Sequence, residues 1–427
     1  MNGRKAVSLI RLKNKADDSI MFSQLSRSVR QYLIITGNYW CFTLTDGALR
    51  MLVVLYFYEL GYGALDIALL FVFYEAFGVV TNLFGGWLGA RWGLNRTMNI
   101  GLGMQIAALG MLLVPDSWLT VVWVMAAQAL SGIAKDLNKM SAKSSIKVLV
   151  PKGESGQLYQ WIALLTGSKN ALKGIGFFIG GLLLTTVGFH QAIFIMTLAL
   201  GLVWAFSLWQ LKEDLGKTKS KPKFTEIFSK SREINILSAA RLFLFGARDV
   251  WFVVALPVYL SSQFGWDHWT VGGFLALWVI GYGIVQSLAP HITGKRSEQP
   301  PSAQVITLWA LALTALPAAI AIGLKMSFYP QITLLGGLIL FGAIFAVNSS
   351  LHSYLIVQFA SKEGVSMDVG FYYMANAMGR LIGTLLSGWI YQEYGLISCL
   401  WVSFGFLFLT SVISLWLPKK IKEQPSL

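Results

Sequence analysis

Cysteine, histidine and charged residues are all scarce in this chain of 427 residues. The only two cysteines, Cys41 and Cys399, lie in separate apolar stretches, so we expect core filling rather than a disulfide framework or a zinc site. The four histidines are scattered and form no metal-ligand cluster. No His, Asp and Ser constellation of an interfacial enzyme is apparent. We therefore expect no cofactor, no metal and no enzymatic activity.

Charged residues make up 13% of the sequence and hydrophobic residues 55%, whereas a soluble domain is about one quarter charged. Apolar stretches of about 20 residues, enough for a helix to cross a hydrocarbon core of about 30 Å, recur along the chain. The alternating ten-residue pattern of a membrane barrel is missing, so we predict an all-α integral membrane protein. No other stretch is long enough for a soluble domain, which argues against a sensor.

Twelve stretches are predicted to span the membrane, six on each side of a basic linker at residues 212–233. They divide the chain into an N-terminal half at 31–211 and a C-terminal half at 234–417, with tails at 1–30 and 418–427. The first tail lacks the apolar core of a cleavable signal. Two six-helix halves suggest the internal duplication found in secondary transporters. The predicted spans are 31–58, 65–89, 97–114, 118–138, 158–187, 189–211, 234–260, 269–290, 303–323, 329–357, 369–391 and 395–417.

The formal net charge of +14 arises from 34 basic and 20 acidic residues. Most basic residues lie in the tails, in the linker and in the loops of one side, whereas the loops of the other side contain Lys325 alone. This distribution follows the positive-inside rule and predicts a multi-pass protein of the cell (inner) membrane with both termini in the cytoplasm. We therefore attribute the charge to topology and expect no nucleic-acid partner.

Two glycine-rich segments resemble motifs of the major facilitator superfamily. The segment "GGWLGARWGLNR", residues 85–96, resembles its inner-loop motif, although Ala90 replaces the acidic residue and puts the charge latch of that motif in doubt. The segment "GIGFFIGG", residues 174–181, resembles its antiporter motif, with Phe177 in place of the proline. Close helix packing would also explain these glycines. The resemblance implies a fold of twelve transmembrane helices in two pseudo-symmetric six-helix halves.

Full charges lie near the middle of several predicted spans, where one charge costs at least about 2.5 kcal/mol. The resemblance places these spans around a central cavity. Cations outnumber anions there, so we predict a net-positive cavity that binds a small anionic substrate, for which guanidinium groups are well suited. The candidate substrate-binding residues are Arg50, Lys169, Lys173, Arg248 and Arg380, and the candidate coupling or orienting residues are Asp46, Glu75 and Asp249.

The spacing of these charges leaves several interpretations open. Asp46 and Arg50 are four residues apart, so they could neutralise each other, or Arg50 could face the substrate. "TDGALRMLVV" around them and "LFGARDVWFVV" in the second half share a Gly-Ala step flanked by Arg and Asp. Lys169 and Lys173 would repel each other unless an anion lies between them. Glu75 could carry protons or serve as a fixed partner of a cation such as that of Arg380.

Lysines recur every four residues in "AKDLNKMSAKSSIKVLV", at the inner end of the predicted span 118–138 and in the loop after it, and this spacing forms one cationic row. The row consists of Lys135, Lys139, Lys143 and Lys147. Such a row is typical of an anchor for lipid headgroups. Alternatively, it could form a vestibule that draws an anion from the cytoplasm.

Four segments resemble the organoarsenical efflux permeases of the same superfamily, the ArsJ type. They are "GNYWCFTLTDGALRMLVVLYF", "FYEAFGVVTNLFGG", "GLNRTMNIGLGMQ" and "AQALSGIAKDLNKMSAKSSIK". The resemblance implies a monomeric carrier that exports 1-arseno-3-phosphoglycerate and confers arsenate resistance. Glyceraldehyde-3-phosphate dehydrogenase would supply this substrate by using arsenate in place of phosphate. An organophosphate or other organic-anion antiporter is the alternative, whereas a carrier of trivalent arsenic would be expected to offer paired thiolates.

Overall fold

The computed structural model describes residues 26–61, 70–151, 153–212, 215–217, 228, 230–293, 303–361 and 364–418. Most of both predicted tails and of the predicted linker lies outside these residues, although α2 begins within the predicted N-terminal tail. Every regular element in the described chain is a helix, and η1 is a short 3-10 helix. The elements are α2 (Arg27–Glu59), α4 (Val72–Trp92), α5 (Leu94–Met111), η1 (Asp116–Trp118), α6 (Val121–Leu149), α7 (Ser155–Val187), α8 (Phe189–Gln210), α9 (Arg232–Phe252), α10 (Ala255–Phe264), α11 (His268–Thr293), α12 (Ala303–Lys325), α13 (Pro330–Phe359) and α14 (Val365–Ser414).

These helices make twelve crossings within the described chain. Helices α9 and α10 form one crossing, interrupted near Val253 and Val254. Helix α14 contains two crossings, because the backbone leaves the helical conformation at Gly395, where φ is 75°. By length and composition, eight helical segments are apolar enough to cross a membrane; α4, α5 and α6 carry buried polar side chains and are not among them. The prediction of an all-α membrane protein is confirmed.

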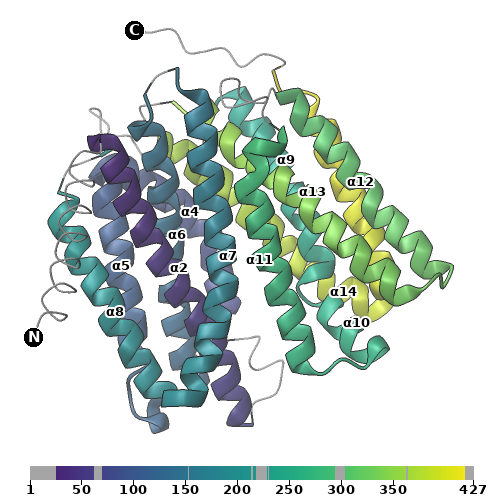
Figure 1. Cartoon of the computed structure of the whole chain (residues 1–427), viewed down its shortest axis with the longest axis horizontal. Coiled ribbons are helices and arrows are strands. Elements are labelled where there is room, and N and C mark those ends of the chain that lie inside the picture. The colour runs from purple at the N-terminus through teal and green to yellow at the C-terminus, as the bar shows by residue number, and fades with distance from the viewer. Residues whose placement is uncertain are drawn as a thin grey trace, which may run out of the picture.

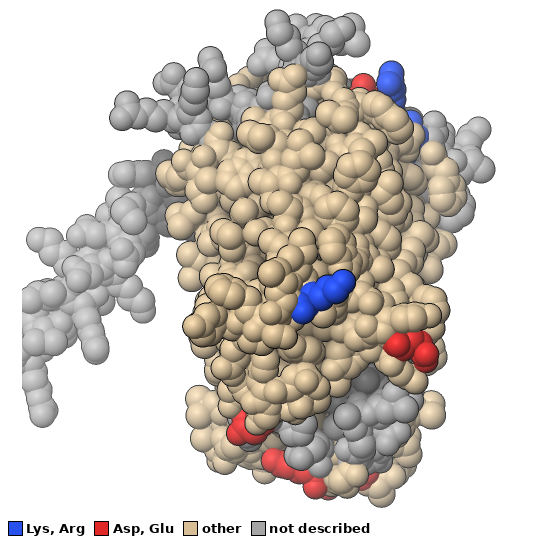
Figure 2. Space-filling view, turned by 90° about the vertical axis from the view of Figure 1, so that its right-hand side faces the viewer, with Lys and Arg blue, Asp and Glu red and all other residues tan. Residues whose placement is uncertain are grey.

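The helices form two groups that lie side by side (Figure 1). Helices α2 to α8 occupy the left of this view and helices α9 to α14 the right, and α7 packs against α11 where the groups meet. Helix α2 begins and α14 ends at the top of the view, which we call the upper end of the bundle. Figure 2 shows the right-hand face as a broad uncharged surface with scattered charged side chains, as expected of a surface in contact with lipid.

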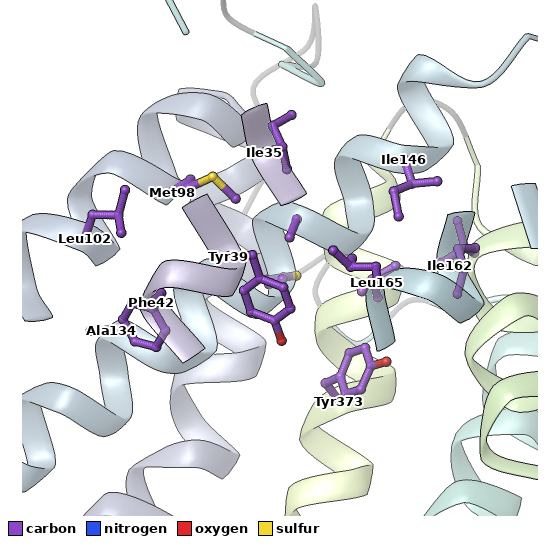
Figure 3. Packing of buried hydrophobic residues seen from close by; sticks show 14 of the residues in the cluster. Ile35, Tyr39, Phe42, Met98, Leu102, Ala134, Ile146, Ile162, Leu165 and Tyr373 are labelled. Carbon is purple, nitrogen blue, oxygen red and sulfur yellow. The ribbon is translucent and has the colours of Figure 1, made fainter. Parts of the chain in front are cut away.

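The hydrophobic core consists of two clusters, of which the first joins the two groups of helices. It contains residues of α2 and α5 to α8 and extends to buried residues of α13 and α14, including Tyr354 and Tyr373. Figure 3 shows Tyr373 of α14 near Tyr39 of α2 and Leu165 of α7, although these residues are far apart in the sequence. The second cluster is confined to α9 to α14. The apolar packing between the groups is therefore concentrated in the half of the bundle nearest the upper end.

Helix α6 is longer than the sequence predicted. The predicted span ended at residue 138, whereas α6 continues to Leu149. Lys143 is 2% exposed and Ser144 is fully buried in this extension. The extension packs against other helices, so its backbone N–H and C=O groups are shielded from water. Continuing the helix satisfies these groups with hydrogen bonds.

The Gly-Ala steps shared by the two halves occupy equivalent helix crossings. A Cβ atom at Gly47 of α2 would lie 2.7 Å from the carbonyl oxygen of Lys173 on α7. A Cβ atom at Gly383 of α14 would lie 2.7 Å from the carbonyl oxygen of Gly246 on α9. The close backbone approach is therefore permitted by Gly47 itself in the first half and by Gly383, the neighbour of Gly246, in the second. The domain bounds themselves stay a prediction.

Gly176 and Gly180 of "GIGFFIGG" pack against α2 and Gly174 packs against α11, which confirms their expected packing role. A Cβ atom at Gly176 would lie 2.7 Å from the carbonyl oxygen of Leu44. We expect Gly176→Ala to lower the melting temperature of the purified protein, because an overpacked helix contact costs about 1–3 kcal/mol. Gly181→Ala is the matched control, since its Cβ would meet the Leu55 side chain at an ordinary 3.8 Å. Equal melting temperatures for the two variants would contradict the packing role.

Candidate functional site

Five charged side chains form a connected network in the middle of the bundle. The Arg50 Nη2 atom on α2 donates to Glu75 Oε1 on α4 at 3.2 Å, and Arg380 Nη2 on α14 donates to the same oxygen at 3.1 Å. Arg380 Nε also donates to Asp249 Oδ2 on α9 at 3.1 Å. Arg248 Nε donates to the other oxygen of Asp249 at 2.6 Å. This mid-bundle network therefore connects both groups of helices and contains one more cation than anion.

The two ends of the mid-bundle network differ in exposure. The side chains of Glu75 and Arg380 are each 32% exposed and that of Arg50 is 27% exposed. Asp249 is fully buried and the Arg248 side chain is 15% exposed. Such buried pairs are favourable only when their remaining donors and acceptors are also bound. The Arg50 Nε atom has no hydrogen-bond partner among the described residues, so this end of the network has a free donor.

Aromatic rings surround the arginines of the mid-bundle network. The Arg50 guanidinium lies 4.9 Å from the centre of the Phe71 ring and 4.7 Å from that of Tyr74. Arg248 lies 4.9 Å from the Phe245 ring centre. Ring faces stabilise a cation without neutralising it. The rings therefore hold the arginines in place without removing their positive charge.

Asp46 lies beside the mid-bundle network but contacts a tyrosine instead of Arg50. The Tyr74 hydroxyl donates to Asp46 Oδ1, at 2.7 Å, and also lies 3.0 Å from Oδ2. A direct pair between Asp46 and Arg50 is contradicted, because the Arg50 guanidinium pairs with Glu75 on α4 instead. The predicted contact between Glu75 and Arg380 is confirmed.

Lys169 and Lys173 lie one turn apart on α7, and no hydrogen bond or ion pair joins either to another described residue. The charge of Lys173 acts on Arg50, Asp46 and Glu75, so this lysine belongs with the mid-bundle network. Lys169 lies within electrostatic range of Lys139, Lys173 and Lys143 and, more weakly, of Arg380. Lys169 therefore lies between Lys139 of α6 and the mid-bundle network, and the expected repulsion between Lys169 and Lys173 is present.

The lysine row of α6 faces the interior of the bundle. Lys135 Nζ lies 3.7 Å from the centre of the Tyr74 ring, and Lys139 Nζ lies 4.8 Å from that of Tyr373 on α14. Lys143 hydrogen-bonds the Tyr373 hydroxyl, and the Lys147 ammonium donates to a backbone carbonyl of α13 at 3.0 Å. The interpretation of the row as an anchor for lipid headgroups is wrong, because these ammonium groups contact helices of the bundle.

Arg241 of α9 and Tyr74 of α4 take part in the polar interior, although the sequence did not single them out as site residues. Arg241 is 3% exposed and donates from Nε to Asn376 Oδ1 at 2.9 Å and from Nη1 to the carbonyl oxygen and hydroxyl of Ser349. Its position near the end of a predicted span disguised it, because arginines there commonly extend to the membrane surface.

The sequence model described as Major Facilitator Superfamily matches residues 35–346. The chain belongs to the major facilitator superfamily. It is therefore a multi-pass membrane protein of a superfamily of secondary transporters, and the predicted fold of twelve transmembrane helices is confirmed. No curated protein matches the sequence significantly.

Solved structures of transporters share this major facilitator fold. A bacterial homologue of the iron transporter ferroportin, in an outward-facing state, has a TM-score of 0.72 and 14% identity over 90% of this chain and 98% of its own. The human organic anion transporter MFSD10 (TETRAN) has a TM-score of 0.72 and 16% identity over 91% and 100% of the two chains. The Escherichia coli fucose:proton symporter FucP has a TM-score of 0.71 and 12% identity over 92% and 100%.

The inner-loop motif of this major facilitator holds the upper ends of the two halves together. A Cβ atom at Gly86 of α4 would lie 2.5 Å from the carbonyl oxygen of Ser366 on α14, so only glycine permits this approach. The Ser366 hydroxyl donates to the Gly86 carbonyl oxygen at 2.7 Å. Ala90, in the place of the acidic residue of the motif, is fully buried. A backbone contact and a hydroxyl bond therefore occupy the place of a charge latch.

Proposed function

We propose that this major facilitator exports an anionic, phosphate-bearing organoarsenical, 1-arseno-3-phosphoglycerate, from the cytoplasm by alternating access. The observation that carries the proposal is the net-positive mid-bundle network, whose Arg50 and Arg380 are partly exposed and belong to different halves. Three guanidinium groups around two carboxylates leave one positive charge for a substrate. Lys173 adds a further cation beside them.

Competition between carboxylates and substrate would couple binding to movement of the halves. Arg380 of α14 links Glu75 of α4 with Asp249 of α9. An incoming phosphate or arsenate group offers the same kind of acceptor as Glu75 and would take over part of its hydrogen bonding. The Arg380 bridge between the halves would then be weaker when substrate is bound than when the site is empty. A ligand that changes a contact in this way shifts the equilibrium between the conformations of the carrier.

The identity of the substrate rests on the resemblance of residues 30–417 to organoarsenical efflux permeases. It implies a functional link to glyceraldehyde-3-phosphate dehydrogenase, which would make the substrate in the same cell. We place both termini in the cytoplasm and the protein in the inner membrane on the distribution of basic residues. We infer that it acts as a monomer. An antiporter of organophosphates or other organic anions is the second candidate, favoured by the same excess of cations.

Uptake into everted membrane vesicles tests the proposal directly. Vesicles that contain the wild-type protein should accumulate the arsenic-labelled substrate faster than vesicles without it. Arg248→Gln should reduce the initial rate about tenfold or more, because a lost charge-assisted hydrogen bond is worth about 1.5–3 kcal/mol. Lys325→Gln is the matched control, since this lysine ends α12 away from the mid-bundle network. Equal uptake by the Arg248→Gln and wild-type vesicles would remove Arg248 from the substrate site.

A competition experiment decides between the two candidate substrates. An excess of an unlabelled, arsenic-free three-carbon phosphate that abolishes labelled uptake would favour the organophosphate antiporter. Uptake that persists in this excess would support the arsenical substrate.

A further inference from the structure

Four cations lie together above the mid-bundle network, nearer the upper end of the bundle. We call them the upper cluster; its members are Lys139 and Lys143 of α6, Lys169 of α7 and Arg241 of α9. The positive charge of Lys143 is repelled by those of Arg241 and Lys139, and that of Lys169 is repelled by those of Lys139, Lys173 and Lys143. Helices of both halves therefore bring like charges into one region.

An aromatic pair lies at the centre of the upper cluster. Lys139 Nζ and Lys143 Nζ lie 4.8 Å and 4.7 Å from the centre of the same Tyr373 ring. The Arg241 guanidinium lies 5.3 Å from the centre of the adjacent Tyr372 ring. These two rings meet edge to face with centroids 5.0 Å apart. The tyrosines thus bring cations of α6 and α9 towards one another across the boundary between the halves.

The upper cluster has too few anions for its burial. Lys143 is 2% exposed and Arg241 is 3% exposed. Within the described chain, the one carboxylate paired with a member of the cluster is that of Asp136, which lies 2.6 Å from Lys139 Nζ. Lys143 and Arg241 have only neutral hydrogen-bond partners there. A buried charge without an opposite charge is costly, so this region is suited to a negatively charged ligand.

A free hydrogen-bonding group lies on the side of α2 that faces Tyr373 of the aromatic pair. Tyr39 of α2 is 1% exposed, and its hydroxyl has no hydrogen-bond partner among the described residues. Figure 3 shows this ring below a layer of apolar side chains, on the side towards Tyr373. A phosphate or carboxylate group would accept a hydrogen bond from a tyrosine hydroxyl as well as from the ammonium groups.

We propose that the upper cluster is a second anion-binding subsite, which takes one phosphate-like or carboxylate group while the mid-bundle network takes another. Lys169 of the upper cluster and Lys173 beside the mid-bundle network are four residues apart on α7, a rise of about 6 Å. A short carbon skeleton with an anionic group at each end matches this separation. The inference rests on the proposed function in that the ligand is the transported anion, and it narrows the substrate class to compounds with two anionic ends.

Calorimetric titration of the purified protein with two probes tests the second subsite. The probes are propane-1,3-diol bisphosphate, with two anionic ends, and propyl phosphate, with one. The wild-type protein should bind the bisphosphate about tenfold or more tightly than the monophosphate, since each added charge-assisted contact contributes on this scale. Lys143→Gln should bring the two affinities within about threefold of each other, and Lys143→Arg should preserve most of the preference.

A second variant keeps the test independent of folding. Lys169→Gln removes a cation that has no hydrogen bond or ion pair among the described residues, so we expect it to fold and to lose the preference as well. Lys325→Gln should bind both probes as the wild-type protein does. An undiminished preference for the bisphosphate in both Lys143→Gln and Lys169→Gln would overturn the second subsite.

The binding test and the vesicle test fail in different ways. Loss of the bisphosphate preference in the upper-cluster variants supports the subsite even if the arsenical is not taken up, in which case only the proposed substrate is wrong. Uptake of the arsenical that Arg248→Gln reduces would support the proposed function. If Lys143→Gln and Lys169→Gln keep the preference for the bisphosphate, the subsite is refuted even though the proposed function stands.

Discussion

Arg380→Gln is expected to reduce transport about 100-fold and to lower the melting temperature, which is the largest effect that we predict for one substitution. Arg380 donates to Glu75 and to Asp249, which lie in different halves. Removing one partner of a buried ion pair costs about 3–5 kcal/mol. Because the Arg380 side chain is 32% exposed, we expect the loss of stability to fall at the lower end of that range and the loss of substrate binding to dominate.

Initial uptake rates in everted vesicles and thermal unfolding of the purified protein check this prediction. Arg380→Lys is the matched control, because it keeps the charge but has no planar fork that can reach two carboxylates at once. We expect its transport to lie between those of Arg380→Gln and the wild-type protein. If Arg380→Gln transports normally, the bridge between the halves plays no part in the cycle.

Glu75→Gln is expected to lower the KM for the anion about tenfold and to slow turnover by a similar factor. Glu75 Oε1 accepts hydrogen bonds from both Arg50 and Arg380. Neutralising it releases both guanidinium groups and increases the net positive charge of the mid-bundle network. The substrate should then bind more tightly and leave more slowly, on the scale of about 1.4 kcal/mol per tenfold change.

Measurement of both kinetic constants distinguishes the two roles considered for Glu75. A lower KM and a lower maximal rate, with unchanged dependence on a pH gradient, would support a fixed partner of the arginines. Loss of gradient-driven accumulation with normal exchange of substrate for substrate would instead assign proton coupling to Glu75. Glu59→Gln, at the end of α2, is a suitable control. An unchanged KM would contradict competition between Glu75 and the substrate.

Hydropathy predicted most of the fold, because burial in lipid demands long apolar helices wherever the chain crosses. It could not predict details that depend on neighbouring helices. The extension of α6 to Leu149 is stabilised by its burial against other helices, and the break near Val253 divides one crossing into α9 and α10. Both features depend on tertiary packing, which the apolar content of a segment does not reveal.

The candidate site was predictable in its residues but not in its pairings. The cost of an intramembrane charge picked out Arg50, Glu75, Asp249 and Arg380, all of which lie in the mid-bundle network. Spacing along one helix suggested a pair between Asp46 and Arg50. The observed partners come from other helices, because α4 and α14 bring Tyr74, Glu75 and Arg380 into the same space. The roles of these residues in transport stay predictions.

The contact between Gly86 and Ser366 at the upper end has a consequence for how the protein responds to its surroundings. Ions in solution weaken attraction between opposite charges, with a screening length of about 8 Å at physiological ionic strength. A close backbone approach and a neutral hydroxyl bond contain no full charge for those ions to screen. This contact between the halves should therefore keep its strength from dilute to salty surroundings, whereas a contact made by an ion pair would not.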